Sequence, residues 1–219
     1  MNVCWLGRVA YEDALQRQET LLEQRLKGEI EDTLLLLEHE PVYTIGRGRD
    51  RSSLDAGVVL PHPVVEISRG GKATYHGPGQ LVGYAILDLR QYGQDLHAYL
   101  RALELSLIAL CADLGLQAER REELTGTWIG DRKLASIGVG VRRWITMHGF
   151  ALNICDDLAG FDAIIPCGIA GVTMTSLAQE LPDQEFSVEK VAQKYPPFLQ
   201  KQLNELGAKA DLSKDESRA

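Results

Sequence analysis

Three β-rich runs in the C-terminal half of the chain are separated by very short polar turns. The runs cover residues 128–129, 134–141 and 145–154, and the turns cover 130–132 and 142–143. A connection of two or three residues joins antiparallel neighbours, because a parallel pair needs a crossover of about a dozen residues or more. The pattern therefore predicts a largely antiparallel or mixed sheet and argues against a doubly wound parallel one.

Amphipathic helical patterns interleave with these runs. Residues 10–27 place their apolar side chains on one stripe, and Gly28 is a suitable stop. Asp95 is a suitable N-cap for a second helix, whose leucines recur every three or four residues until Gly115. A last helical region starts at Ser187, breaks at Pro196 and resumes as far as residue 206. Further strands are predicted at residues 32–37, 43–45, 64–67 and 81–89. The combined pattern indicates an α+β fold.

Length and composition fit one soluble globular domain. The chain has 219 residues, of which 45% are hydrophobic and 25% charged, so it can bury a core and disorder is not its main state. Acidic residues outnumber Lys and Arg by 31 to 23, a net charge of −8 that disfavours a globally basic nucleic-acid binder. We expect a single domain over residues 1–208 and a disordered tail over residues 209–219, where the apolar content falls.

No targeting or metal signal is recognisable in the sequence. No apolar run approaches the roughly 20 residues of a membrane span, and the N-terminus lacks the charged and apolar regions of a signal peptide. We therefore expect a cytoplasmic protein without a membrane partner, and its four cysteines form no C-x-x-C pair. No His/Cys spacing matches a zinc site, so we predict no metal. The common nucleotide-binding signatures are also missing from the sequence.

A glycine-rich segment at Arg69–Gln80 lies between two predicted strands. It holds four glycines and one proline among twelve residues, with Arg69, Thr74, His76 and Gln80 as polar side chains. Glycines let main-chain N–H groups approach a ligand because no Cβ intervenes. The segment is either a ligand-binding frame or a long connection rich in turn residues, and long loops of this composition are more often functional.

Two further segments carry reactive side chains. Lys133 starts a strand whose other residues look buried, so it is either a solvated edge lysine or a lysine that points into a cleft. Cys167 stands between Pro166 and Gly168, a frame that presents a thiol on a bend. It is either a nucleophile or a buried structural thiol; the structural role suits Cys111 better, because that residue lies inside a predicted helix.

The histidines receive different expectations. His39, His62 and His97 are expected at the surface or in turns. His148 lies near the end of a predicted strand and is placed to line a cleft, and His76 has the chemistry of an acid or base.

These segments together closely resemble the lipoyl(octanoyl) transferases, which move an octanoyl group from acyl carrier protein to lipoyl domains. Arg69–Gln80 meets the family pattern Arg-Gly-Gly-x-x-Thr-x-His-Gly-Pro-Gly-Gln in full, and Arg132–Gly138 meets the pattern around the family's lysine. His148–Asn153 and Pro166–Ile169 supply the remaining two motifs. The resemblance runs from about residue 6 to residue 206.

The resemblance implies a fold shared with the biotin and lipoate ligases, a central mixed sheet flanked by helices. It implies that Cys167 forms the acyl thioester and that Lys133 lowers the pKa of that thiol or shuttles its proton. It also implies an acyl pocket lined by three stretches of the chain. These are Arg69, Gly70, Gly71, Lys72, Ala73, Thr74, Tyr75 and His76; Ser136, Ile137 and Gly138; and Gly149, Phe150 and Ala151.

The implied reaction is the first step of endogenous protein lipoylation. An acyltransferase of this kind needs no cofactor, ATP or metal, because its donor is already a thioester. Its implied partners are acyl carrier protein, the lipoyl domains of 2-oxoacid dehydrogenase complexes and the glycine cleavage H protein. These partners are typically acidic, so docking to a chain of charge −8 calls for a local basic patch. Candidates for that patch are Arg47, Arg49, Arg51, Arg142 and Arg143.

Three other functions remain open at this point. One is an ATP-dependent lipoate or biotin ligase of the same fold, another is a non-catalytic acyl-binding module, and the third is a thioester hydrolase. ATP dependence, a missing covalent adduct and release of free octanoate, respectively, would distinguish them.

Overall fold

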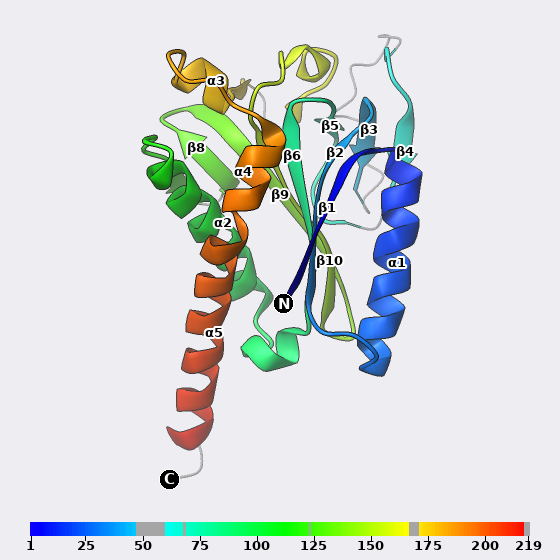
Figure 1. Ribbon diagram of the computed structural model, residues 1–219, viewed down its shortest axis with the longest axis vertical. Helices are drawn as coiled ribbons and strands as arrows, with labels where there is room; N and C mark the ends of the chain where they lie inside the picture. The colour runs from blue at the N-terminus through cyan, green and yellow to red at the C-terminus, as the bar shows by residue number, and fades with distance from the viewer. Residues whose placement is uncertain (47–59, 68, 123, 167–170, 217–219) are drawn as a thin grey trace.

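A mixed sheet of eight strands forms the centre of the computed structural model, which describes residues 1–46, 60–67, 69–122, 124–166 and 171–216 (Figure 1). Within these residues the strand order is β1-β2-β6-β10-β9-β8-β7, and β11 pairs with β9. The pairs β1/β2 and β9/β11 are parallel and the others antiparallel, as the short turns predict. The bounds are β1 Asn2–Val9, β2 Thr33–His39, β6 Gln80–Ile86, β7 Glu119–Arg121, β8 Leu124–Ile129, β9 Arg132–Arg142, β10 Ile145–Asn153 and β11 Thr173–Met174.

A second, three-stranded sheet is built from β3 (Val42–Ile45), β4 (Val64–Glu66) and β5 (Thr74–His76) in the order β4-β3-β5. Strand β5 lies inside the glycine-rich segment, which the sequence predicts to be a loop. It forms a strand because its three residues are buried and pair antiparallel with β3.

Helices cover both faces of the large sheet. In Figure 1, α1 (Tyr11–Lys27) lies on one side, while α2 (Leu96–Asp113) and α5 (Pro196–Glu216) lie together on the other. Both predicted helix ends are confirmed: Gly28 has a left-handed φ of 74°, and the Asp95 carboxylate accepts a hydrogen bond from Ala98 N at 3.0 Å. The short helices are α3 (Leu177–Glu180), α4 (Val188–Lys194), η2 (Leu89–Tyr92) and η3 (Ala159–Phe161).

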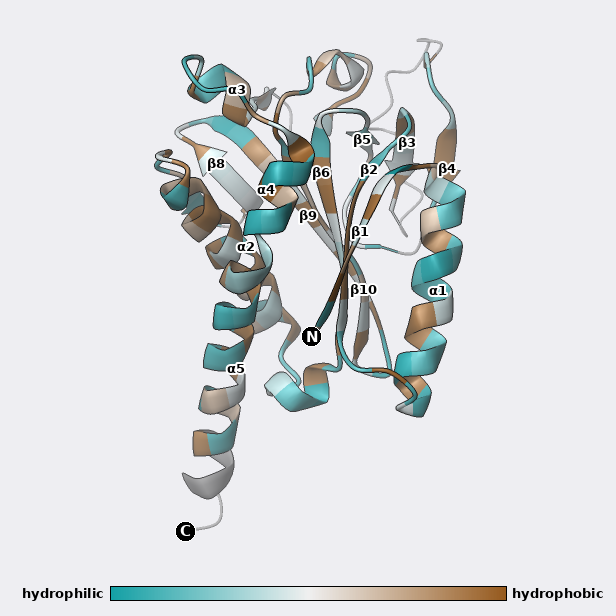
Figure 2. Cartoon of the chain, in the orientation of Figure 1, coloured by the Kyte–Doolittle hydropathy of each residue, from teal (hydrophilic) through white to brown (hydrophobic). Residues whose placement is uncertain are grey.

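The main core lies between the large sheet and the pair α2 and α5. Leucines of β2, β6 and β10 meet leucines of α2 there, and the Phe150 ring lies edge-on to Tyr195 with 4.7 Å between their centroids. In Figure 2 the strands of the large sheet carry many brown segments, while α1 and α5 alternate between teal and brown turns. None of the described helices is long and apolar enough to cross a membrane.

Two terminal elements differ from the expectations. Strand β1 was not predicted, because its half-exposed residues show no regular alternation; it pairs parallel to β2 at the sheet edge. Helix α5 continues to Glu216, through most of the segment expected to be a disordered tail. Ala210 explains part of this extension, since its side chain is buried and lies close to Gly93, which follows η2.

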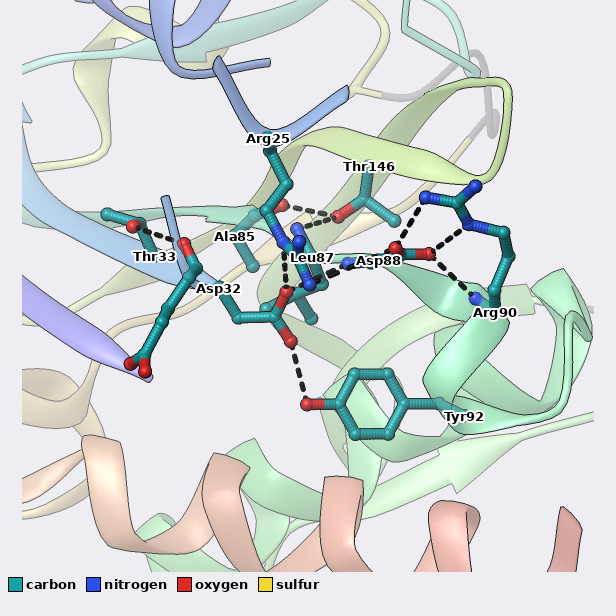
Figure 3. Close-up of polar contacts among 10 residues, drawn as sticks. Arg25, Asp32, Thr33, Ala85, Leu87, Asp88, Arg90, Tyr92 and Thr146 are labelled. Atoms are coloured by element: carbon teal, nitrogen blue, oxygen red, sulfur yellow. Dashed lines mark hydrogen bonds and ion pairs between the residues drawn. The ribbon is translucent and has the colours of Figure 1, made fainter. Parts of the chain in front are cut away.

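A buried polar network ties the end of α1 to the large sheet (Figure 3). Asp32 accepts hydrogen bonds from Arg25 Nε at 2.8 Å, from Asp88 N at 2.9 Å and from Tyr92 Oη at 2.7 Å. The side chain of Asp32 is 6% exposed, so three donors compensate a carboxylate that water barely reaches.

Candidate functional site

A cavity of about 430 Å³ lies between the glycine-rich segment and the central strands β9 and β10. Thirteen of the predicted site residues line it: Arg69, Gly70, Gly71, Lys72, Thr74, His76, Lys133, Ser136, Ile137, Gly138, Gly149, Phe150 and Ala151. The lining also reaches helices on both faces of the sheet, through Tyr11 of α1 and through Leu96 and Leu100 of α2.

A pair of facing glycines creates room in this part of the sheet. Gly138 of β9 lies opposite Gly149 of β10. A Cβ at Gly138 would lie 3.0 Å from the carbonyl oxygen of Gly70, and a Cβ at Gly149 would lie 2.2 Å from the carbonyl oxygen of Gly83. Any larger residue at Gly149 would therefore collide with backbone, and one at Gly138 would press on the glycine-rich segment.

The glycine-rich segment is fixed to β9 by a backbone hydrogen bond and to β3 by the side chain of Arg69. Gly70 N donates to Val139 O at 3.0 Å, which joins the segment to β9. The Arg69 guanidinium donates to the hydroxyl of Thr44 at 2.8 Å and to the carbonyl of Gly70 at 2.8 Å. Arg69 is 8% exposed, so the loop enters the site with a buried cation attached to β3.

A β-bulge explains how Lys133 reaches the cavity. Thr127 pairs with Ala135 and Trp128 pairs with Lys133, so one step along β8 corresponds to two steps along β9. An extra residue reverses the alternation of side chains beyond it. Lys133 and Ser136, three residues apart, therefore both line the cavity.

The side chain of Lys133 is held deep in the protein. Lys133 is 2% exposed, and its Nζ lies 5.2 Å from the centroid of the Trp128 ring. An ammonium at that distance over an indole face makes a favourable cation–π contact. The sequence left a solvated edge lysine as one alternative, and the structure excludes it.

Three histidines and two tyrosines cluster beside the cavity. His39 was expected at the surface, but it is fully buried, because α1 covers the end of β2 and brings the Tyr11 ring to 5.0 Å from its ring. His39 Nδ1 lies 3.1 Å from the carbonyl of Val9, which can only accept, so Nδ1 carries the proton. Its Nε2 then accepts from the Tyr84 hydroxyl at 2.6 Å, and burial lowers the pKa of His39 to about 4.

His148 belongs to the same cluster, and one of its ring nitrogens lacks a hydrogen-bond partner among the described residues. Its backbone has a left-handed φ of 60°, and its backbone N–H donates to Gln18 Oε1 at 2.8 Å. Among the described residues its buried Nε2 has no hydrogen-bond partner. Burial, followed by the nearby charge of Arg69, lowers the pKa of His148 to about 4. His148 is therefore a neutral imidazole that lines the cavity at neutral pH.

His76 begins a chain of hydrogen bonds that leads from the cavity wall to β9. Its Nδ1 donates to Gln80 Oε1 at 2.8 Å, and Gln80 Nε2 donates to Asn153 Oδ1 at 3.0 Å. Asn153 Nδ2 in turn donates to the carbonyl of Thr175 at 2.9 Å, and Thr175 N donates to the carbonyl of Lys133 at 3.0 Å. Burial, the largest cause, holds the pKa of His76 well below its usual range. A neutral His76 thus links the glycine-rich segment to the strand of Lys133.

Some sequence-derived candidates lie elsewhere. Ala73, which precedes β5, and Tyr75 of β5 do not line the cavity; the Tyr75 ring packs against Tyr43 and Phe161 instead. Cys167 lies outside the described residues, so its position relative to Lys133 stays a prediction. Lining residues that the sequence analysis did not name as site residues are Tyr11, Tyr84, Leu96, Leu100, Leu124, Thr125, Val139 and His148, although a place for His148 in a cleft was anticipated.

The three described cysteines do not line the cavity. Cys111 is fully buried in α2, and burial raises its thiol pKa to about 12. Cys155 is exposed, and its pKa is raised by partial burial and by the charges of Asp156 and Glu38. Neither thiol has the electropositive surroundings that make a cysteine reactive near neutral pH.

The proposed basic patch is only partly described. Arg47, Arg49 and Arg51 lie outside the described residues. Arg142 forms an ion pair with Glu23 of α1, and Arg143 is exposed in the hairpin between β9 and β10. A group of three or more His, Cys, Asp or Glu side chains able to hold a metal does not occur among the described residues.

Comparison with known proteins identifies relatives over most of the chain. Residues 10–197 match the family model described as the lipoyl protein ligase A/B catalytic domain. An octanoyltransferase of Geobacter sulfurreducens is 56% identical over 180 residues, which cover 82% of this chain and 75% of that protein. An octanoyltransferase of Syntrophotalea carbinolica is 52% identical over 192 residues, covering 87% and 89% of the two chains.

Solved structures share the fold at low sequence identity. The bipartite lipoate protein ligase of Thermoplasma acidophilum is 14% identical, with a TM-score of 0.67 over 95% of this chain and 90% of that one. The biotin protein ligase of Aquifex aeolicus in complex with biotin and ATP is 14% identical, with a TM-score of 0.60 over 95% and 73%. These likenesses confirm the predicted architecture, a mixed sheet flanked by helices as in biotin and lipoate ligases.

Proposed function

The chain belongs to the octanoyltransferases of the lipoyl protein ligase A/B catalytic-domain family, and we propose that it transfers an octanoyl group from acyl carrier protein to a lysine of lipoyl domains. The activity is that of an acyltransferase in protein lipoylation. The observation that carries the proposal is the placement of Lys133, a deeply buried lysine that lines a cavity opened by the Gly138–Gly149 pair.

The cavity suits an acyl chain. Apolar side chains of α2, β8 and β9 contribute to its wall, and each buried CH₂ of a ligand is worth roughly 0.8 kcal/mol. These apolar residues are Leu96, Leu100, Leu124, Ile137 and Val139. The remainder of the octanoyl pocket would come from the glycine-rich segment, the Ser136–Gly138 stretch of β9 and the Gly149–Ala151 stretch of β10.

The proposed first step makes an acyl-enzyme. The thiolate of Cys167 attacks the carbonyl carbon of the octanoyl thioester, and the bond to the carrier's sulfur breaks. The carrier leaves as its thiol after taking up one proton from the Lys133 ammonium, which leaves Lys133 as a neutral amine for the second step. Support for Cys167 comes from elimination, because Cys111 and Cys155 have raised thiol pKa values and, with Cys4, lie off the cavity. An ammonium at Lys133 favours the thiolate of a nearby thiol.

The proposed second step forms the product amide. The neutral amine of the acceptor lysine attacks the Cys167 thioester, the carbon–sulfur bond breaks, and the amine's extra proton passes to the thiolate or to Lys133. Exchange of one thioester for another is nearly isoenergetic, and conversion of a thioester to an amide is downhill. The proposal therefore includes no ATP, metal or other cofactor.

The proposed partners follow from this chemistry. The donor is acyl carrier protein, and the acceptors are the lipoyl domains of 2-oxoacid dehydrogenase complexes and the glycine cleavage H protein. Arg143, exposed at the hairpin tip, and the arginines at 47, 49 and 51 are proposed as the basic docking groups.

The experiment is an acyl-transfer assay with octanoyl acyl carrier protein and an isolated lipoyl domain, with and without ATP. We expect octanoylated domain to form equally in both conditions. Cys167→Ala should lose the product and Lys133→Ala should form it much more slowly, while both variants remain folded. Strict ATP dependence with free octanoate would instead identify a ligase, and release of free octanoate without transfer would identify a hydrolase.

A further inference from the structure

A fully buried glutamate lies in the middle of the leucine-rich helix α2. Glu104 is 0% exposed. One carboxylate oxygen accepts a hydrogen bond from the backbone N–H of Gly126 in β8 at 2.9 Å, and the other accepts from Arg101, whose side chain is 41% exposed. Burial of a carboxylate among leucines costs several kcal/mol unless the bonds it makes compensate. The hydrogen bond to Gly126 is one of the two contacts that offset this cost.

Gly126 lies next to the Cε and Nζ atoms of Lys133. A Cβ placed on Gly126 would lie 2.8 Å from Lys133 Cε and 3.5 Å from Lys133 Nζ. The backbone of Gly126 has a φ of 137°, a conformation that residues with a side chain rarely adopt. The peptide held by Glu104 thus forms one side of the space in which the lysine ammonium lies.

Trp128 forms another boundary of the same space. Its ring centroid lies 5.2 Å from Lys133 Nζ, and Trp128 follows Gly126 by two residues on β8. The bulge that turns Lys133 into the cavity begins beside these residues, where the regular pairing of β8 with β9 is interrupted. The β8–β9 ladder is irregular here, and Glu104 supplies Gly126 with a contact from outside the sheet.

We propose that Glu104 is a positioning residue for acyl transfer, which fixes the Gly126 peptide by its hydrogen bond and so holds the Lys133 ammonium in the cavity. This inference rests on the proposed function, since it presupposes a reaction that uses Lys133. The hydrogen bond, rather than the negative charge, is the effective contact, because the carboxylate acts on a backbone N–H.

Three single variants separate the hydrogen bond from the charge and from packing. Glu104→Gln keeps an acceptor oxygen for Gly126 N, whereas Glu104→Ala removes it. Ser106→Ala is the matched control: Ser106 is also a buried polar residue of α2, but it bonds to Leu103 O and Tyr195 Oη, away from the cavity. We expect Glu104→Ala to slow formation of the acyl-enzyme by about tenfold or more, as misplacement of a reacting group does, and Glu104→Gln to restore most of the rate.

The decisive measurement is a double-mutant cycle between Glu104→Ala and Lys133→Ala, with the folded fraction checked by circular dichroism. If Glu104 acts through Lys133, the double variant reacts as slowly as Lys133→Ala alone. A merely structural role predicts that the two losses multiply, and that Ser106→Ala loses as much rate as Glu104→Ala for the same drop in melting temperature. Either result would overturn the inference, as would full activity in Glu104→Ala. A wild-type enzyme that forms no acyl-enzyme would instead refute the proposed function.

Discussion

The Nζ atom of Lys133 lies 5.2 Å from the centroid of the Trp128 ring, and Arg121 lies over the same ring at 5.0 Å. The indole therefore contacts two cations that come from different strands. A contact of this kind is worth about 2 kcal/mol when it is desolvated, and Trp128 is fully buried. The ring both fills the core and holds the ammonium that the proposed reaction uses.

Replacement of Trp128 by Leu should separate these two roles. We expect Trp128→Leu to lower the rate of octanoyl transfer by about tenfold, the value that corresponds to a loss of 1.4 kcal/mol, because the ammonium loses its aromatic surface. Trp128→Phe keeps an aromatic face and should retain more activity at a comparable loss of stability. Single-turnover transfer rates and thermal denaturation measure the two quantities, and equal activity in both variants would contradict this role for the ring.

Substitution of Gly138 tests the fit of the cavity. A Cβ at this position would lie 3.0 Å from the Gly70 carbonyl oxygen and 3.1 Å from Arg69 Cδ, so the glycine-rich segment must shift. We expect Gly138→Ala to fold but to show a lower kcat/KM for octanoyl acyl carrier protein, by about tenfold for a displacement of this kind. Gly207→Ala is the control, since Gly207 lies in α5 and a Cβ there meets only ordinary contacts. Unchanged kcat/KM in Gly138→Ala would show that substrate does not use this part of the cavity.

The Asp32 network predicts a large effect on stability. Asp32→Ala leaves Arg25 without its 2.8 Å partner and removes the acceptor for Asp88 N and Tyr92 Oη. Removal of one partner from a buried ion pair costs about 3–5 kcal/mol, so we expect a loss of that size in the free energy of unfolding. Urea denaturation measures it, with the exposed pair of Lys194 and Asp113 as the control. A loss no larger than that of Asp113→Ala would contradict the importance of this network.

The buried histidines predict that stability declines in mild acid. The pKa of His39 and that of His148 are about 4 in the folded protein, against an ordinary value of 6.5. The unfolded chain therefore binds more protons between pH 6.5 and pH 4, so stability is complete above that interval and falls as the pH decreases through it. Each histidine contributes up to about 3 kcal/mol over the whole interval, at about 1.4 kcal/mol for each pKa unit.

The titration of Asp156 changes the stability in the opposite direction, so this carboxyl has to be removed for the measurement. Burial raises the pKa of Asp156 to about 7, so this carboxyl destabilises the fold when ionised and the penalty disappears as the pH falls. Asp156→Asn provides a background without that titration. In it, the free energy of unfolding should drop between pH 7 and pH 4.5, and His39→Gln should make the slope shallower. A flat profile in the Asp156→Asn protein would mean that the histidines are not held neutral.

Local chemistry made much of this fold predictable. Gly28 and Asp95 end and begin their helices as predicted, because a left-handed stop and an N-cap depend on a few neighbouring residues. The β9–β10 hairpin was predictable for the same reason, since a two-residue turn can join its two strands only as antiparallel neighbours. Sequence motifs likewise indicated the stretches that line the cavity.

Features that depend on distant partners were not predictable in this way. His39 is buried among the rings of Tyr11, His76 and Tyr84, which come from α1, β5 and β6. The orientation of Lys133 depends on a bulge that exists only in the pairing of β9 with β8, and neither strand shows it alone. Tyr11 and Tyr84 come from segments without a motif, and they reach the site through tertiary packing. Continuation of α5 to Glu216 depends on packing beside η2, which the polar composition of that segment does not reveal.

In the proposed reaction the acyl group passes through the sulfur of Cys167, and mapping of the covalent adduct would reveal this step. The protein would be mixed with octanoyl acyl carrier protein without acceptor or ATP, digested, and analysed by mass spectrometry for octanoylated peptides. We expect one octanoyl thioester on Cys167, retained in Cys155→Ser and lost in Cys167→Ser. An adduct on Cys155 or Cys4, or transfer to a lipoyl domain by Cys167→Ser at the wild-type rate, would contradict it.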